Sequence, residues 1–329
     1  MVMEKMILLA KKRASGLLEN TALMLLVIVI LAFSAASPFF FTPFNLNNII
    51  VQNAHVLVMI TGLIFVMQGG GFDLSVGYQI SLVSVVVGYL LSEGTPLFWT
   101  ICAGVLTGIL CGTFNGSIIS LFHISPAIVT LITHELFRGM SYMLSGGVSY
   151  SDFPKTFRYI TNTTVLGLTG VHCITMLSIV FAIIVFRYTV FGKIVLAMGY
   201  DAHILEKNGI GTKGARILSY VICGFFCSIA AILIVSRQGV ASSAIGPGME
   251  IKGVMAACIA GVSSNLLAKN HKRVPTFNYY IGVLIMAIIE NGMLLTGNNQ
   301  YVECCITSLI ILISVIPGGT VWLKEKKRQ

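Results

Sequence analysis

Long apolar runs recur along nearly the whole of this 329-residue chain and constrain its fold more than any other feature. Each run is long enough to cross the hydrocarbon core of a bilayer, which is about 30 Å thick and needs roughly 20 residues of helix. Only 10% of the residues are charged, whereas soluble domains hold about 25%. Stretches such as 21–33 and 306–316 are almost continuously apolar, unlike the alternating strands of a membrane barrel. The sequence therefore predicts an all-α, polytopic membrane protein.

About ten transmembrane helices are expected from these runs. They cover residues 21–41, 46–67, 75–91, 98–120, 127–145, 172–188, 214–235, 251–263, 277–296 and 301–317. The eighth is short for a full crossing, which favours a broken or partly re-entrant helix that lies inside protein rather than against lipid.

Basic residues flank the apolar part of the chain and account for much of the net charge of +9. They are Lys5, Lys11, Lys12 and Arg13 before the first run, and Lys324, Lys326, Lys327 and Arg328 after the last. By the positive-inside rule both termini are cytoplasmic, so the number of spans is even. A basic tail could also bind nucleic acid or anionic lipid, but orientation in the membrane explains its placement more simply. We expect a multi-pass protein of the inner (plasma) membrane and no nucleic-acid partner.

A faint internal repeat predicts the organisation of the spans. In each copy, glycines lead to an acidic residue, and an Asn-Gly pair follows 42 or 41 positions later; the landmarks are 69–71, Asp73 and Asn115, then 246–248, Glu250 and Asn291. Each landmark falls at the same place in a group of five spans. An odd number of spans per copy inverts one copy relative to the other. The chain 1–329 is therefore expected to be a single transmembrane domain with two inverted five-helix halves, roughly 1–145 and 172–329.

The glycine-rich interruptions are the candidate pathway for a polar molecule. Three consecutive glycines break a helix, and Asp73 and Ser75 offer an N-cap to the helix that follows. In transporters, such half-helix ends line polar cavities near the membrane interior. A turn with an N-cap at the membrane surface is the alternative, and Glu250 could equally cap the eighth span. The candidate pathway residues are Gly70, Gly71, Asp73, Ser75, Asn115, Glu250 and Asn291.

Two further patterns concern single helices. Glu135 and Arg138 stand three residues apart in the fifth span, a spacing that allows an ion pair and favours internal neutralisation over contact with a solute. Residues 201–208, in the longest cytoplasmic segment, read as a short amphipathic helix that Asp201 caps and Gly209 ends. Such a helix suits a groove on a soluble partner, and an interfacial surface helix is the alternative.

The sequence holds no signature of catalysis. It has no phosphate-binding loop of the G-x-x-x-x-G-K-[ST] type, so the chain is not expected to use ATP by itself. No nucleophile pairs with a base by spacing, and the eight cysteines lie in apolar runs without histidines at metal spacing. We therefore expect no catalytic residues, no metal and no cofactor.

Four stretches resemble the permease family of ribose-type ABC importers, which carry ribose and related sugars. They are Gly70 to Gly77; Asn115-Gly116 with 125–131 and 137–139; Phe191-Gly192 with 197–199 and Gly209-Ile210; and 246–250 with Asn291-Gly292. Their order and spacing run from about residue 40 to 318. After Val262-Ser263 relatives usually have several glycines, whereas here 265–275 holds no glycine, which puts the geometry of this loop in doubt and makes heteromeric pairing plausible.

The resemblance implies a permease subunit of an importer for a small polar solute such as a monosaccharide, driven by ATP hydrolysis in partner subunits. The implied partners are ABC ATPase subunits, a second permease copy or homologue, and an extracytoplasmic solute-binding protein. The coupling segment implied for the ATPase holds Asp201, His203, Glu206, Lys207 and Gly209. From the residues alone, an ion-coupled secondary transporter and a non-transporting receptor or scaffold remain open.

Overall fold

The computed structural model describes residues 21–165, 168–261, 274–297, 301–302, 305–309 and 312, and these residues are almost entirely helical. The helices are α2 (Thr21–Ala36), α3 (Pro43–Gln68), α4 (Val76–Ser92), α5 (Leu97–Phe122), α6 (Pro126–Ser145), α7 (Lys155–Asn162), α8 (Gly170–Tyr188), α9 (Val190–Lys207), α10 (Lys213–Gln238), α11 (Met249–Ile259) and α13 (Thr276–Leu295). A two-residue antiparallel ribbon joins α7 to α8, with β1 at Thr164–Val165 and β2 at Leu168–Thr169.

Five of the described helices are long and apolar enough to cross a membrane: α3, α5, α8, α10 and α13. The shorter helices α2 and α4 are also apolar. The prediction of an all-α, polytopic membrane protein is therefore confirmed. The described residues form two compact units, one made of those up to 50 with those from 254 onward, and the other of 51–253.

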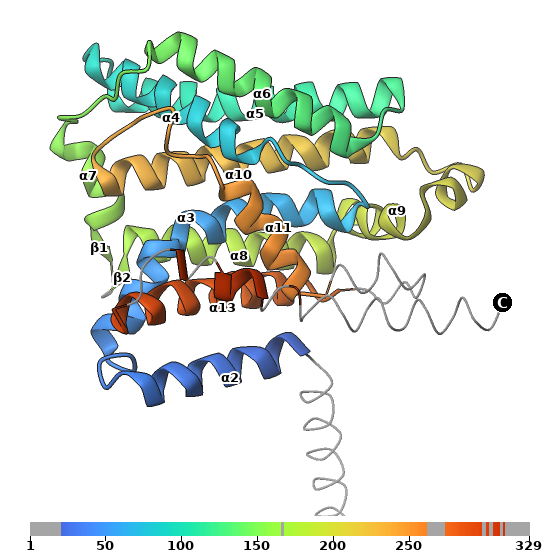
Figure 1. Ribbon diagram of the computed structural model, residues 1–329. Helices are drawn as coiled ribbons and strands as arrows, with labels where there is room; N and C mark the ends of the chain where they lie inside the picture. Colours follow the sequence, from blue (N-terminus) through green and yellow to red (C-terminus); the bar gives the residue numbers. More distant parts are fainter. Residues whose placement is uncertain are drawn as a thin grey trace, which may run out of the picture. The chain divides into compact units, whose positions relative to one another are not determined.

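The larger unit, 51–253, contains the helices that carry most of the candidate site (Figure 1). Within this unit, α5 and α10 have the most extensive contact. Small residues on α5 recur every four positions and make this contact possible; they are Gly104, Gly108, Gly112 and Gly116. A Cβ on Gly112 would collide with the carbonyl group of Tyr220, and one on Gly108 would lie 2.9 Å from the Cβ of Ser228. Small residues at this spacing let two helix backbones approach closely inside a membrane.

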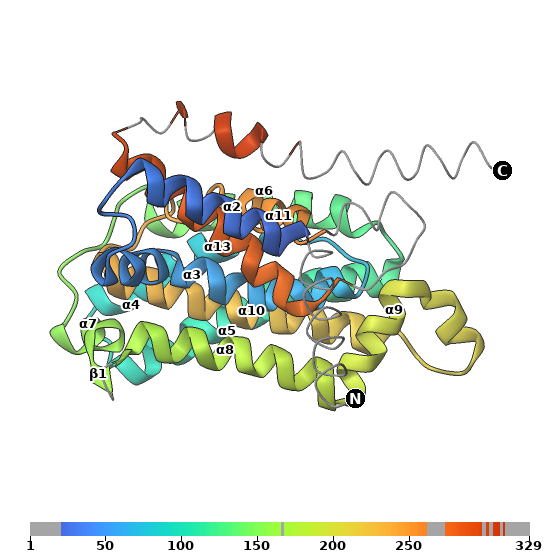
Figure 2. The same cartoon turned by 90° about the horizontal axis from the view of Figure 1, so that it is seen from below.

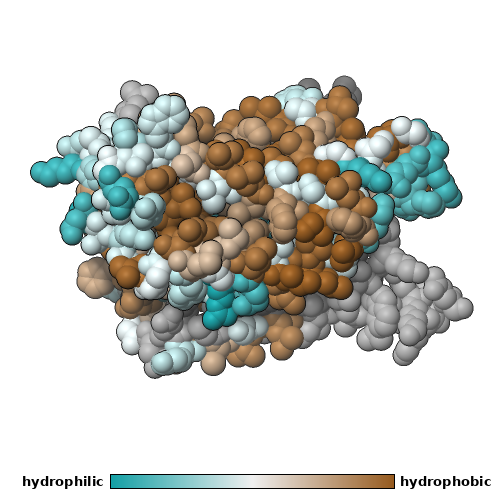
Figure 3. Space-filling model, turned by 90° about the horizontal axis from the view of Figure 1, so that it is seen from above, coloured by the Kyte–Doolittle hydropathy of each residue, from teal (hydrophilic) through white to brown (hydrophobic). Residues whose placement is uncertain are grey.

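The two ends of this unit differ in structure (Figures 1 and 2). Both views place α7 and the β-ribbon at one end of the helices and α9 at the other. On the face that carries α5 and α6, hydrophobic residues form a broad central band and hydrophilic residues gather at both ends (Figure 3). A hydrophobic band between two polar ends is the surface expected of a membrane-spanning bundle.

Several predicted boundaries are wrong, each for a local reason. The first helix ends at Ala36 rather than at 41, because Ser37 precedes Pro38 and a residue before proline avoids the helical conformation. The segment after α8 is helical from Val190 onward rather than only from 201, with a bend at Asp201. The eighth span, α11, is indeed short, with 11 residues. Most of the tenth predicted span, 301–317, lies outside the described residues.

In the smaller unit, Asn45 at the start of α3 and Asn291 in α13 form a reciprocal pair. Each side-chain amide donates to the other's carbonyl oxygen at 2.9 Å, and Asn45 Nδ2 also donates to the Phe40 carbonyl. Both residues are buried. Asn291, a predicted pathway residue, is therefore held in a polar contact within the smaller unit.

Candidate functional site

A buried network surrounds Asp73, in the segment that joins α3 to α4. The Asp73 side chain is only 1% exposed, and Oδ1 accepts hydrogen bonds from the Ser75 amide at 2.9 Å and the Ser75 hydroxyl at 2.6 Å. Asn115 Nδ2, on α5, donates to Ser75 Oγ at 2.8 Å. The structure therefore brings together three of the residues singled out in the sequence, Asp73, Ser75 and Asn115.

Gln79 completes this network and was not singled out in the sequence. Its side-chain amide donates to Ser75 Oγ at 2.7 Å and to Asp73 Oδ2 at 3.2 Å. Gln79 follows Ser75 by one helical turn, so it points to the same face of α4. A polar residue four positions after the expected cap, inside an apolar run, is the signal that could have found it.

The predicted capping role of Ser75 is wrong in detail. Ser75 does occupy the N-cap position of α4, but its side chain makes no capping hydrogen bond. Its hydroxyl donates to Asp73 instead and accepts from Gln79 and Asn115. The carboxyl group of Asp73 therefore organises the start of α4 through Ser75.

The start of α4 meets the chain just before α11. The Gly77 backbone lies so close to Gly246 that a Cβ on Gly77 would be 2.8 Å from the Gly246 carbonyl oxygen, and it would collide with Glu250 Oε2. Gly246 N donates to Ser81 Oγ at 3.1 Å, and Gly248 N donates to Glu250 Oε1 at 3.0 Å. The two glycine-rich landmarks of the sequence, 69–77 and 246–250, thus touch where two apolar helices begin.

Three side-chain oxygens around this junction are buried and have no hydrogen-bond partner within the described ranges. They are Gln79 Oε1, Asn115 Oδ1 and Glu250 Oε2. Buried acceptors without a donor are costly, about 1–3 kcal/mol each, so native structures keep few of them. These three oxygens are therefore the unused hydrogen-bond acceptors of the junction in this conformation.

A small cavity lies beside the glycine segment. It has a volume of about 150 Å³ and is lined by Val66, Gly69, Gly70, Gly71, Pro126, Met198, Arg216, Ser219 and Tyr220. The hydroxyl of Tyr220, one of the lining residues, donates to the Phe72 carbonyl oxygen at 2.9 Å and so fixes the residue that precedes Asp73. Gly70 adopts φ +78°, a conformation that glycine enters without steric cost.

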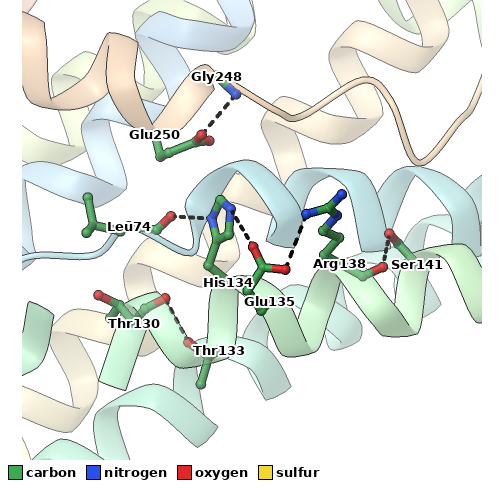
Figure 4. Close-up of polar contacts among 9 residues, drawn as sticks. All are labelled: Leu74, Thr130, Thr133, His134, Glu135, Arg138, Ser141, Gly248 and Glu250. Carbon is green, nitrogen blue, oxygen red and sulfur yellow. Dashed lines mark hydrogen bonds and ion pairs between the residues drawn. The ribbon is translucent and has the colours of Figure 1, made fainter. Parts of the chain in front are cut away.

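Charged side chains lie on the exposed face of α6, close to this network (Figure 4). His134 Nδ1 is 3.0 Å from the Leu74 carbonyl oxygen, and Arg138 Nη1 donates to Glu135 Oε2 at 3.3 Å. The predicted ion pair between Glu135 and Arg138 is confirmed, but their side chains are 62% and 50% exposed within the chain. Arg138 also lies over the Tyr78 ring, 5.9 Å from its centroid.

The predicted short helix at the end of α9 is present. Asp201 breaks the helical conformation with φ −162° and ψ 104°, and its Oδ1 accepts from the amides of His203 at 2.8 Å and Ile204 at 3.2 Å. Gly209 ends the helix with φ +76°. Glu206 accepts a hydrogen bond from the Thr212 hydroxyl. Asp201, His203, Glu206, Lys207 and Gly209 are all exposed.

Comparison with known proteins decides the family. Residues 45–315 match the family described as branched-chain amino acid transport system / permease component. The chain belongs to this family. It is a membrane-spanning permease, a transport subunit, and the resemblance that its four stretches indicated is confirmed.

Individual relatives cover nearly all of this permease. It is 28% identical over 315 residues to the ribose import permease protein of Haemophilus influenzae, covering 94% of this chain and 95% of the relative. The corresponding protein of Escherichia coli strain K12 is 27% identical over 309 residues, covering 91% and 93%. An autoinducer 2 import system permease protein of Enterobacter sp. strain 638 is 26% identical over 313 residues, covering 91% of each chain. No solved structure matches this permease.

Proposed function

We propose that this permease is the translocation subunit of an ATP-driven importer for a small polyhydroxylated solute, such as a monosaccharide. The observation that carries the proposal is the near-complete alignment with relatives named as import permeases for ribose and for autoinducer 2. The polar junction between α4 and α11 supports it, because unpaired acceptor oxygens within a membrane bundle suit a solute that brings its own hydroxyl groups.

The pathway lies, in this proposal, against the exposed face of α6 and is completed by a second permease copy or a homologue. Glu135 follows the first residue of this 20-residue helix by nine positions, which places it about 14 Å along a helix of about 30 Å. A charged side chain near the middle of a helix costs about 2.5–3.5 kcal/mol against lipid. Since Glu135 and Arg138 are exposed within one chain, another subunit or a water-filled pathway should cover them.

The candidate pathway residues Gly70, Gly71, Asp73, Ser75, Asn115, Glu250 and Asn291 remain proposals. Asp73, Ser75 and Asn115 are buried and bonded to one another, so they would reach a solute only after the segment around them moves. This fits alternating access, in which the solute site is closed in some states and open in others. We further propose one domain of ten spans in two inverted halves, with both termini cytoplasmic in the inner membrane.

The proposed partners follow from the exposed end of α9. Its short helix after Asp201 would dock on ABC ATPase subunits, with His203, Glu206 and Lys207 in the contact and Gly209 ending the helix. An extracytoplasmic solute-binding protein would deliver the solute. Hydrolysis of ATP would then occur in the partner subunit, in keeping with a chain that lacks a phosphate-binding loop.

The test is purification of the full-length chain with its copurifying subunits, followed by reconstitution into proteoliposomes. We expect a Walker-type ATPase to copurify and ribose or a related sugar, supplied with its binding protein, to accumulate only when ATP is available to that subunit. Accumulation driven by an ion gradient, without any ATPase, would identify a secondary transporter instead. Absence of solute movement with a bound partner present would identify a receptor or scaffold.

A further inference from the structure

The first limb of α9 rests directly on the glycine segment that follows α3. A Cβ on Gly199 would collide with the Gln68 carbonyl oxygen and would lie 3.1 Å from the Gly70 amide nitrogen. The neighbouring Met198 places its methyl group 2.8 Å from where a Cβ on Gly69 would stand. Gly199 and Gly70 therefore meet backbone against backbone, with no side chain between them, and the Met198 side chain packs beside this contact on Gly69.

The same segment leads within three residues to the polar network. Gly70 contacts α9, the Phe72 carbonyl accepts from Tyr220, and Asp73 holds Ser75 at the start of α4. One residue of extended chain spans at most about 3.6 Å, so little slack exists between Gly70 and Asp73. A displacement of Gly70 must therefore be transmitted to Asp73 or be absorbed by rotation about Gly71.

The opposite limb of α9 is exposed. It begins at the bend at Asp201, and Tyr200 and Ile204 beside the bend are exposed. Asp201 accepts two amide hydrogen bonds from this limb, so the bend has a defined geometry rather than a frayed one. The limb of α9 after Asp201 is therefore exposed, while Gly199, two residues before the bend, contacts the glycine segment.

The cavity beside the segment provides room for movement. Its volume of about 150 Å³ is below the roughly 300–1,000 Å³ of pockets that hold small-molecule ligands. Interiors packed at native density resist displacement. Free volume lined by Gly69, Gly70, Gly71 and Met198 is therefore better explained as space into which the segment shifts than as a solute site.

We propose that the contact between Gly199 and Gly70 is the route by which α9 moves the Asp73 segment, and that α9 and residues 69–71 move as one body. Gly199 and Gly70 are positioning residues in this scheme, since they touch no solute. The inference rests on the proposed function, because it needs an ATPase that acts on α9. It adds the specific backbone contact through which that action reaches the polar network.

The first experiment compares hydrogen exchange in the purified complex with and without ATP. In the wild type, ATP should change exchange both in 190–207 and in 69–75. In Gly199→Ala, the change in 190–207 should persist while the change in 69–75 falls at least five-fold. The matched control is Gly211→Ala, since Gly211 has open space around it and no positive φ; it should behave as the wild type.

The outcomes separate the two proposals. If ATP changes neither segment in the wild type, the proposed function fails, and this inference fails with it. If ATP changes 190–207 alone in the wild type, or if Gly199→Ala keeps the full change in 69–75, only this inference fails.

A second experiment applies even if Gly199→Ala does not assemble. Gly69→Cys with Met198→Cys should be joined by a short bifunctional methanethiosulfonate reagent, because in the structure the methionine side chain spans the gap between residue 198 and Gly69. Movement as one body predicts that this crosslink forms at equal rates with and without ATP, and that it leaves ATP-driven change in 69–75 within two-fold of the uncrosslinked protein. A rate that differs ten-fold between the two states, or a change that disappears on crosslinking and returns when the crosslink is reduced, overturns the inference.

Discussion

Substitution of Asp73 separates the hydrogen-bond geometry of the network from its charge. In Asp73→Ala, the Ser75 amide and the Ser75 hydroxyl both lose the acceptor that they share, Asp73 Oδ1. An unsatisfied buried donor costs about 1–3 kcal/mol, so two of them cost about 2–6 kcal/mol. Since folded proteins are stable by only about 5–15 kcal/mol, this loss removes a large part of the stability of the fold.

Asp73→Asn should behave very differently. An asparagine oxygen at the Oδ1 position keeps both Ser75 hydrogen bonds, while the new amide faces the Gln79 donor that lies 3.2 Å from Oδ2. Rotation of the Gln79 amide presents Oε1, which has no partner among the described residues, to that new donor. The net loss is the Gln79 hydrogen bond to Ser75, about 1 kcal/mol.

The free energy of unfolding in mixed micelles measures this difference directly. The gap between Asp73→Ala and Asp73→Asn should be at least about 1 kcal/mol and could reach about 5. Glu93→Ala, at the exposed end of the same helix, is the control and should stay within about 0.5 kcal/mol of the wild type. Equal destabilisation by the two Asp73 variants would refute the reasoning, because the carboxylate charge would then be what holds the segment.

Three further predictions concern other parts of the larger unit. Gly112→Ala forces α5 away from the Tyr220 carbonyl and should destabilise the fold by about 1–3 kcal/mol in the same unfolding assay, whereas Gly214→Ala, in open space near the start of α10, should not. Asp201→Ala removes a helix cap worth about 1 kcal/mol and should weaken ATPase copurification, while Asp201→Asn should preserve it; equal copurification would contradict the docking role. Glu135→Gln and Arg138→Gln each leave one charge unpaired, so each should lower uptake more than the double variant does; a double variant worse than both would contradict mutual neutralisation.

The sequence predicts the all-α, polytopic membrane fold well. The thickness of the bilayer fixes the length of a spanning helix, and each apolar run in the sequence shows that length. Asp73, Ser75 and Asn115 could be singled out because they are polar groups in apolar surroundings, but the sequence does not predict that they bond to one another. It does not predict that Gly77 meets Gly246, because that contact joins positions far apart in the chain and depends on packing. Pro38 indicates that α2 ends early, at Ala36. The prediction of a helix to 41 is wrong because it followed the continuous apolar run past this proline.

The close contact between Gly77 and Gly246 also limits how this permease can open. Because two backbones touch there, without flexible side chains between them, α4 cannot slide past the segment before α11 without separating from it. Opening by separation would expose Glu250 Oε2, which has no partner within the described ranges, and under the proposed function would make it available to a hydroxylated solute. In the proposed scheme, motion that begins at Gly70 would reach this contact through Asp73 and Ser75, since these residues hold the start of α4. The scheme thereby makes the polar network the mechanical link between the glycine segment and the junction of the two interrupted helices.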